Sequence, residues 1–302
     1  MWFLFALLTA FAWGGADLFY KRGSDSRDRY SHLKIVVMVG LVMGIHATAY
    51  LLIQGLSFDP FDMVRYLPVS GLYILSMTIG YIGLRYMELS IASPVQNSSG
   101  VITTILLVIF FSSRLNAVEI LGVTIVTLGV IGLAILEKRA ERAALKAGSE
   151  QINVKYQIGV MAITFPILYA LIDGLGTFAD ALYLDELSLI GEDAALLAYE
   201  YTFFLCAAVC FLYLKLVKKV KFNMLRERDK GSAAVLETAG QFFYVFAMSS
   251  NAIIVAPLIA SYSIFSVILS RIFLKEKLTR QQYAVIAMVI IGIALLGLAD
   301  EL

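Results

Sequence analysis

The chain of 302 residues is 60% hydrophobic and 16% charged, with a formal net charge of +1 at pH 7. The hydrophobic share is above that of a typical soluble domain, and the charged share is below it. This composition excludes an ordinary soluble protein and predicts an integral membrane protein. Nothing in the charge balance indicates a nucleic-acid partner, so we expect membrane lipid and a small molecule instead.

Apolar segments long enough to span a membrane as helices follow one another along the chain, separated by short polar joints. Ten such spans are predicted, at 2–20, 34–56, 62–82, 86–112, 116–137, 156–178, 193–217, 231–249, 252–274 and 279–299. Almost nothing is left for a soluble domain. The predicted fold class is therefore an all-α polytopic membrane protein with ten transmembrane helices.

The two halves of the chain have matching features. Trp13 precedes Asp17 by four residues, and Tyr169 precedes Asp173 by four, at a common offset of 156. Two further pairs match at an offset of 163: Pro94 with Pro257, and Tyr81 with Tyr244. We therefore predict two repeats, at 1–137 and 156–302, joined by a charged linker at 138–155.

Five spans per repeat is an odd number, so homologous repeats must cross the membrane in opposite orientations. Inverted repeats of this kind are the basis of many secondary transporters. Each repeat also contains a capping-box pattern before its last span, Asn116 with Glu119 and Thr279 with Gln282. These patterns predict where the fifth and tenth helices begin.

The distribution of basic residues predicts the orientation of the chain. Of the 24 Lys and Arg residues, 22 lie in the joints after the first, third, fifth, seventh and ninth spans, and the others are Arg65 and Arg114. Basic joints stay on the cytoplasmic side of a membrane. We therefore expect both termini outside the cytoplasm, in a plasma or inner membrane.

Several short motifs recur at matching steps of the two halves. They are Trp13-Gly14, Pro94 and Leu115-Asn116 in the first half, and Tyr169-Ala170, Pro257 and Lys275-Glu276-Lys277-Leu278-Thr279 in the second. With these motifs in this order, the whole chain resembles the ten-helix EamA-type transporters of the drug/metabolite transporter superfamily. The resemblance implies two repeated domains and transport of a small molecule, and it does not name the substrate.

The chain departs from the family pattern in two respects. The glutamate that is common before the last helix of each repeat is present as Glu276, but Ser112-Ser113 occupies the corresponding region of the first half. The family also implies termini inside the cytoplasm, whereas the basic residues of this chain predict the opposite.

Three carboxylates fall inside predicted spans: Asp17, Asp173 and Glu237. A charged side chain in mid-span costs roughly 2.5–3.5 kcal/mol on insertion scales, so such residues are candidates for a functional site. Burial favours a neutral acid, which allows a proton to be exchanged against a cation. The alternative is a structural or gating role, because Asp17 is four residues from Lys21 and each aspartate can lie near an interface.

Aromatic and amide side chains extend this candidate site. Paired aromatics can line a cavity and bind an amine through cation–π contacts, while Gln241 shares a helix face with Glu237. Interhelical hydrogen bonding or simple packing is the alternative for these residues. The candidate residues for substrate binding or coupling are Trp13, Asp17, Tyr81, Asn97, Tyr169, Asp173, Glu237, Gln241 and Tyr244. His46 and Glu200, in contrast, are expected to be satisfied locally.

The leading hypothesis is a secondary transporter that works by alternating access, exports a cationic or zwitterionic amine and uses protons for coupling. An uncoupled exchanger or facilitator of neutral or zwitterionic metabolites, such as amino acids, is the main alternative. A membrane sensor and an intramembrane enzyme are more remote, since the chain has no His-Glu-x-x-His pair. We expect no cofactor, no bound metal and no catalytic residue. Two complete halves allow a functional monomer and do not exclude a homodimer.

Overall fold

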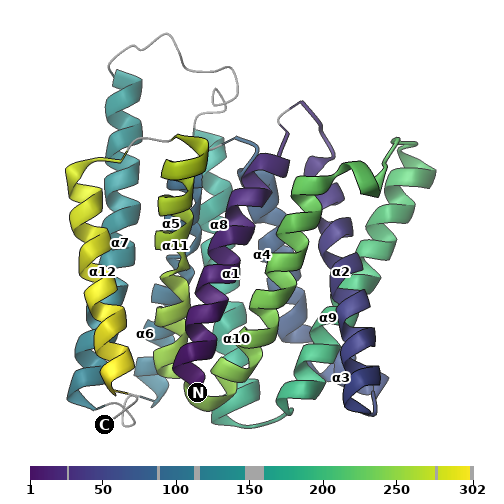
Figure 1. The fold of residues 1–302 in the computed structure, drawn as a ribbon, viewed down its shortest axis with the longest axis horizontal. Coiled ribbons are helices and arrows are strands. Elements are labelled where there is room, and N and C mark those ends of the chain that lie inside the picture. Colours follow the sequence, from purple (N-terminus) through teal and green to yellow (C-terminus); the bar gives the residue numbers. More distant parts are fainter. Residues whose placement is uncertain (26, 87–88, 112–115, 147–159, 276–277, 300–302) are drawn as a thin grey trace.

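The computed structural model describes residues 1–25, 27–86, 89–111, 116–146, 160–275 and 278–299. All regular elements in these ranges are helical, and the helices stand side by side in one bundle (Figure 1). The start of α1 and the end of α12 lie at the same end of this bundle. The predicted all-α fold is therefore confirmed.

The first half of the chain contains the elements α1 to α7. Their bounds are α1 Trp2–Gly23, α2 Ser31–Gln54, α3 Pro60–Arg65, α4 Leu67–Gly83, α5 Leu89–Gln96, α6 Ser99–Phe111 and α7 Ala117–Lys146. Gly55 ends α2 in the left-handed region, with φ of 64°. Asp59 begins α3 by accepting a hydrogen bond from the Phe61 amide, and Pro60 follows as the first helical residue, where its missing N–H costs nothing.

The second half contains the elements α8 to α12 and four short helical turns. The helices are α8 Val160–Ala181, α9 Glu192–Leu212, α10 Arg228–Ala260, α11 Tyr262–Leu269 and α12 Arg280–Ala299. Single π-helical turns extend α8 (Leu182–Glu186), α9 (Tyr213–Val217) and α11 (Ser270–Leu274), and a 3₁₀ turn (Met224–Arg226) precedes α10. Each extended helix thus gains about one turn of length.

Helix breaks follow the matched prolines in both halves. Pro94 lies in α5, which ends two residues later, and Pro257 lies in α10, which ends three residues later. A proline removes a backbone donor and disrupts the helix around it. Asn97 and Ser98 separate α5 from α6, Ser261 separates α10 from α11, and Ser98 and Ser261 are 163 residues apart. The offset observed in the sequence therefore holds for the backbone.

Both predicted capping boxes are present. The Glu119 Oε2 atom accepts from the Asn116 amide at 2.7 Å, and Asn116 Oδ1 accepts from the Glu119 amide at 2.9 Å. At the start of α12, the Gln282 amide donates to Thr279 Oγ1 at 3.3 Å while the Gln282 side chain accepts from the Thr279 amide. The positions where α7 and α12 begin are thus fixed locally, as predicted.

Two elements, α7 and α10, differ most from the predicted spans. The helix α7 continues to Lys146, into the stretch that we predicted to be linker, while residues 147–155 lie outside the described ranges. The helix α10 includes residues from both the eighth and the ninth predicted spans. Its bend is at Asn251, where φ is −164° and ψ is 77°.

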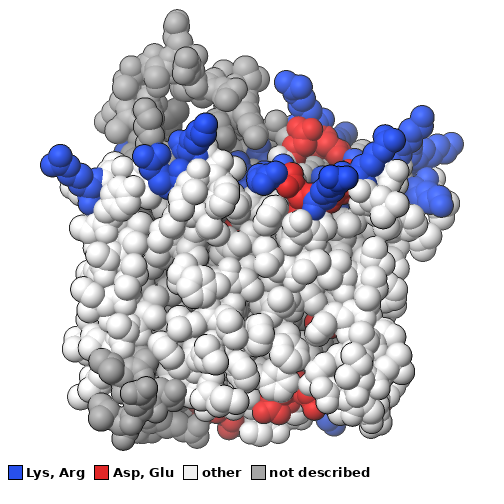
Figure 2. Space-filling view, in the orientation of Figure 1, with Lys and Arg blue, Asp and Glu red and all other residues white. Residues whose placement is uncertain are grey.

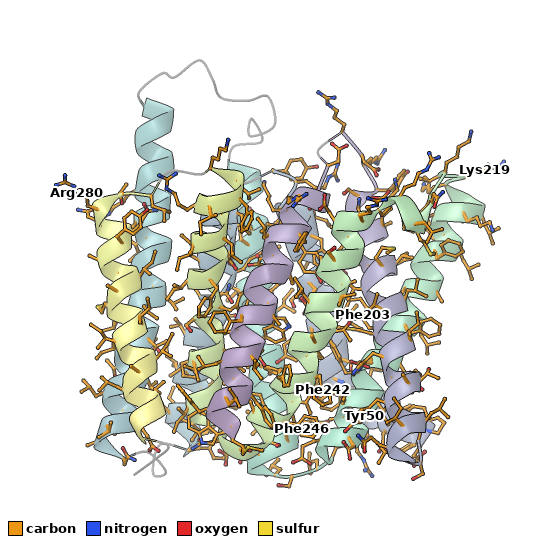
Figure 3. All side chains as sticks on the ribbon, in the orientation of Figure 1. Tyr50, Phe203, Lys219, Phe242, Phe246 and Arg280 are labelled. Carbon is orange, nitrogen blue, oxygen red and sulfur yellow. The ribbon has the colours of Figure 1, made fainter. Side chains whose placement is uncertain are left out.

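Six helical stretches among the described residues are long and apolar enough to cross a membrane. One of them, Arg228–Leu274, is 47 residues long and bends at Asn251, so it supplies two crossings. Three shorter apolar helices bring the crossings to the predicted ten. Lys and Arg gather at one end of the molecule, above a belt almost free of charge on the face shown (Figure 2). We call this the basic end; Lys219 and Arg280 mark it in Figure 3.

Helix contacts in one half have counterparts in the other. The helix α1 packs against α10 and α11, and α8 packs against α4 and α6. The helices α2 and α9 pack against each other, as do α7 and α12. Glycines allow the closest approaches, because a methyl group added at Gly14 would lie 2.6 Å from Phe265 Cβ, and one added at Gly174 would lie 2.9 Å from Ile102 Cβ.

Candidate functional site

A central cavity of about 70 Å³ lies between the two halves, with residues of α1, α4, α8, α9, α10 and α11 and of the α5–α6 break in its wall. All nine site residues predicted from the sequence line it: Trp13, Asp17, Tyr81, Asn97, Tyr169, Asp173, Glu237, Gln241 and Tyr244. The volume is enough for a few water molecules and is smaller than the pockets that hold drug-sized ligands.

Asp17 enters the central cavity from α1. Its Oδ2 atom accepts hydrogen bonds from Ser93 Oγ at 2.6 Å and Ser266 Oγ at 2.7 Å. These serines belong to α5 and α11, so one buried carboxylate connects both broken helices to α1. The Lys21 ammonium, one turn further on, is also buried and donates to the Leu84 carbonyl at 3.0 Å. Leu84 lines the cavity, so a cation lies near the cavity without itself lining it.

Asp173 enters the central cavity from α8. Its Oδ1 atom accepts from Ser76 Oγ at 3.1 Å, and Ser99 and Tyr169 lie near its side chain. The next residue, Gly174, accepts at its carbonyl from Thr103 Oγ1 at 3.0 Å. The two aspartates therefore have comparable surroundings, with hydroxyl donors from neighbouring helices.

Glu237 is the third carboxylate of the central cavity, and it comes from α10. Its Oε2 atom accepts from the Tyr20 hydroxyl at 3.2 Å, while Trp13 Nε1 donates to its carbonyl at 3.3 Å. Its carboxylate interacts electrostatically with those of Asp17 and Asp173. The arrangement therefore gathers three acidic groups around one small volume.

Aromatic rings form much of the remaining wall. The Trp13 ring lies 5.1 Å from the Tyr244 ring and 5.7 Å from the Tyr262 ring, measured between centroids, and the Tyr20 and Tyr81 rings are 4.7 Å apart. Among the described residues that line the central cavity, none is Lys or Arg. A cavity with acidic groups and aromatic faces suits a cation, because both attract positive charge.

One buried acidic cluster was missed in the sequence. Asp180 is fully buried and accepts a hydrogen bond from the Tyr66 hydroxyl. The hydroxyls of Tyr73 and Tyr244, which hydrogen-bond each other at 2.5 Å, lie near its side chain. Both tyrosines line the central cavity, so this cluster extends from it. The sequence does contain a signal for this residue: Asp180 follows Asp173 by seven residues, or two helical turns, so the two side chains lie on the same face of their helix.

His46 and Glu200 form a pair outside the central cavity lining. The His46 Nδ1 atom is 2.8 Å from Glu200 Oε2, and Glu200 is fully buried between α2 and α9. The prediction that these two residues are satisfied locally is therefore confirmed. Leu115, Glu276 and Lys277, which belong to the motifs of the family resemblance, lie outside the described residues, as do Ser112 and Ser113, where the chain departs from the family pattern.

Comparisons with known proteins agree with this architecture. The sequence matches the EamA-like transporter family over residues 1–135 and 160–298. Chains of solved structures match as well, and one crystal structure superposes with a TM-score of 0.66, covering 98% of this chain and 96% of that chain at 12% sequence identity. At that identity the likeness supports the fold alone. None of the curated proteins matches. Because the family match covers nearly the whole chain, this multi-pass membrane protein belongs to the EamA-like transporter family.

Proposed function

We propose that the chain is a secondary transporter of small cationic or zwitterionic amines, with proton coupling through Asp17, Asp173 and Glu237. One observation carries the proposal: these three carboxylates line one cavity whose other walls are largely aromatic and whose described lining contains no Lys or Arg. A buried carboxylate without a cationic partner favours its neutral form. An arriving ammonium group can therefore replace protons in the cavity, and its departure allows them to return.

The proposed mechanism is alternating access by two inverted five-helix repeats. The paired contacts of α1 with α10 and α11, and of α8 with α4 and α6, support such a relation between the halves. In transporters of this kind the halves rock about a site near their interface. The central cavity lies at this interface and is small, which supports a compact substrate or a closed stage of the cycle. The direction we propose is export.

The decisive experiment uses the full chain in proteoliposomes that contain a pH-sensitive dye, under an imposed pH gradient. Amines, amino acids and quaternary ammonium compounds are added in turn. We expect substrate-dependent proton flux that is lost in Asp17→Asn, Asp173→Asn and Glu237→Gln. Glu200→Gln is the matched control, because it removes a buried carboxylate outside the central cavity lining.

Two other outcomes would redirect the proposal. Substrate exchange without proton flux would favour the uncoupled exchanger, and the carboxylates would then have gating or structural roles. Unchanged proton flux in all three cavity variants would show that Asp17, Asp173 and Glu237 do not carry the coupling, while leaving coupled transport in place. Uptake into inside-out vesicles compared with right-side-out vesicles tests the direction.

A further inference from the structure

A second cavity lies at the basic end, where α9 ends and the chain turns toward α10. Its volume is about 540 Å³, within the range of ligand pockets. Phe211, Leu214 and Phe222 supply an apolar wall. The cations Lys215, Lys221 and Arg226 surround it. This headgroup cavity, as we name it, is distinct in position and lining from the central cavity.

The headgroup cavity is built by a joint that folds back on its helix. The Val220 amide donates to the Leu214 carbonyl at 2.9 Å, which returns the chain over the π-helical turn. The Phe211 and Phe222 rings then lie 6.5 Å apart between centroids, tilted by 55°. Lys215 Nζ lies 5.6 Å from the centre of the Phe211 ring. The apolar wall and the nearest cation are therefore held together.

The charge of the headgroup cavity is unbalanced. Glu227 is its acidic lining residue, and its carboxylate is bonded to Lys230 and lies 3.9 Å from Lys34. No ion pair links Lys215, Lys221 or Arg226 to a carboxylate within the described part of the chain. Three cationic side chains are therefore available to bind an anion from outside the protein, and their charge favours such binding.

Large apolar side chains beside the headgroup cavity face outward. Leu225 is 89% exposed, Leu216 65% and Val217 64%. Asn223 holds the short turn that carries Leu225, because its side chain accepts from the Leu225 amide at 3.1 Å. Leucine next to lysine and arginine at the edge of an uncharged belt is the arrangement of a protein surface at a membrane interface.

We propose that the headgroup cavity binds an anionic phospholipid of the cytoplasmic leaflet. The phosphate contacts Lys215, Lys221 and Arg226, and the acyl chains extend along Leu216 and Val217. The cytoplasmic leaflet is rich in anionic lipid, and the basic end is the end that basic residues assign to the cytoplasm. A soluble phosphate would use the same cations but would gain nothing from the exposed leucines.

The test measures lipid binding by the full-length protein in neutral detergent, by native mass spectrometry with phosphatidylglycerol or phosphatidylcholine. We expect phosphatidylglycerol to bind more tightly, and Lys221→Gln/Arg226→Gln to lose about tenfold or more of that affinity, since each basic residue near the surface contributes. The matched control is Lys218→Gln/Lys219→Gln, which removes two charges from the same joint outside the cavity lining. The charge-preserving Lys221→Arg/Arg226→Lys variant is expected to retain binding.

Equal affinity for the two lipids, or equal loss in the control variant, would overturn the proposal in favour of a general surface charge. Competition by glycerol 3-phosphate as effective as that of phosphatidylglycerol would overturn the lipid assignment in favour of a soluble phosphate. Because the charge-preserving variant keeps both cations, its binding separates loss of charge from failure to fold. Transport plays no part in this readout.

Discussion

At the scale of single residues, the central cavity depends on side chains that hold buried carboxylates. Asp17 has two serine donors, from α5 and α11, whereas Asp173 accepts a hydrogen bond from Ser76 of α4. Hydroxyl donors satisfy a carboxylate without neutralising its charge. The aspartates therefore keep the capacity to attract a cation, which an ion pair would remove.

Asp17→Asn and Asp173→Asn are expected to weaken binding of an amine substrate. A hydrogen bond to a charged group contributes about 1.5–3 kcal/mol, so each change should raise the substrate Kd by about tenfold to a hundredfold. Binding to purified protein by calorimetry, with thermal unfolding as the folding control, gives the measurement. An unchanged Kd in both variants would assign the aspartates to structure.

The joint between α1 and α2 contains an acid–base pair with its own pH dependence. Burial opposes ionisation of Asp28, but Lys34, with its Nζ 2.6 Å from Oδ2, and the Tyr30 amide outweigh it and lower the pKa of Asp28. Because the pKa of Asp28 is lower in the folded chain than in the unfolded chain, ionised Asp28 stabilises the fold at pH values above its unfolded pKa of about 3.9. This stabilisation is lost as the pH falls through the folded-state pKa. Melting temperatures below pH 4 should fall more steeply for the wild type than for Asp28→Asn. Parallel curves would contradict the contribution of this pair.

At the scale of the elements, close helix crossings at the broken helices position the central cavity. Gly100 lies just after the break between α5 and α6. A methyl group added there would be 2.2 Å from the Cβ atom of Ala260, which is the last residue of α10. Membrane helices use small residues in this way, because van der Waals packing replaces the hydrophobic effect between them. The crossing of α6 and α10 therefore depends on glycine at this position.

Gly100→Ala is expected to destabilise the protein by about 1–3 kcal/mol, because overpacking forces the two helices apart. Gly71→Ala is the matched control: Gly71 lies in α4, and nothing comes within 4 Å of the added methyl group. That change should be neutral or stabilise by about 0.5–1 kcal/mol through the better helix propensity of alanine. Denaturant unfolding in detergent compares the two variants, and equal effects would show that the crossing tolerates a methyl group.

At the scale of the whole molecule, charge is segregated along the bundle axis. The basic end contains Lys219 and Arg280, while Tyr50, Phe242 and Phe246 lie toward the other end (Figure 3). Both the start of α1 and the end of α12 lie opposite the basic end (Figure 1). The orientation that we propose, with the basic end in the cytoplasm, follows from this separation.

Single-cysteine variants test the orientation in a background without Cys206 and Cys210. We expect Ser57→Cys, in the exposed joint after α2, to react with a membrane-impermeant maleimide in intact cells. Arg280→Cys should react only after the membrane is opened. The reverse pattern would give the orientation that the family resemblance implies and would show that the basic residues of this chain do not determine its topology.

From the sequence we could predict the apolar segments long enough to cross the membrane, the matching of Pro94 with Pro257 and the capping boxes that start α7 and α12. These properties are local, because membrane partition and helix capping depend on neighbouring residues. The helix breaks that follow the two prolines were not predicted. All nine residues that the sequence predicted for the site line the central cavity, and their role in transport remains a proposal. Other lining residues, such as Tyr20, Tyr73 and Tyr262, were not predicted.

Which side chains meet depends on the packing of the whole chain. Ser266 is 249 residues from Asp17, and Tyr66 is 114 residues from Asp180, so no local pattern could assign these partners. The bend of α10 at Asn251 also involves a distant element, because the Ala252 amide donates to Asp185 Oδ2 at 2.8 Å. In a membrane bundle each backbone satisfies its own hydrogen bonds, so side-chain packing between helices determines how they cross.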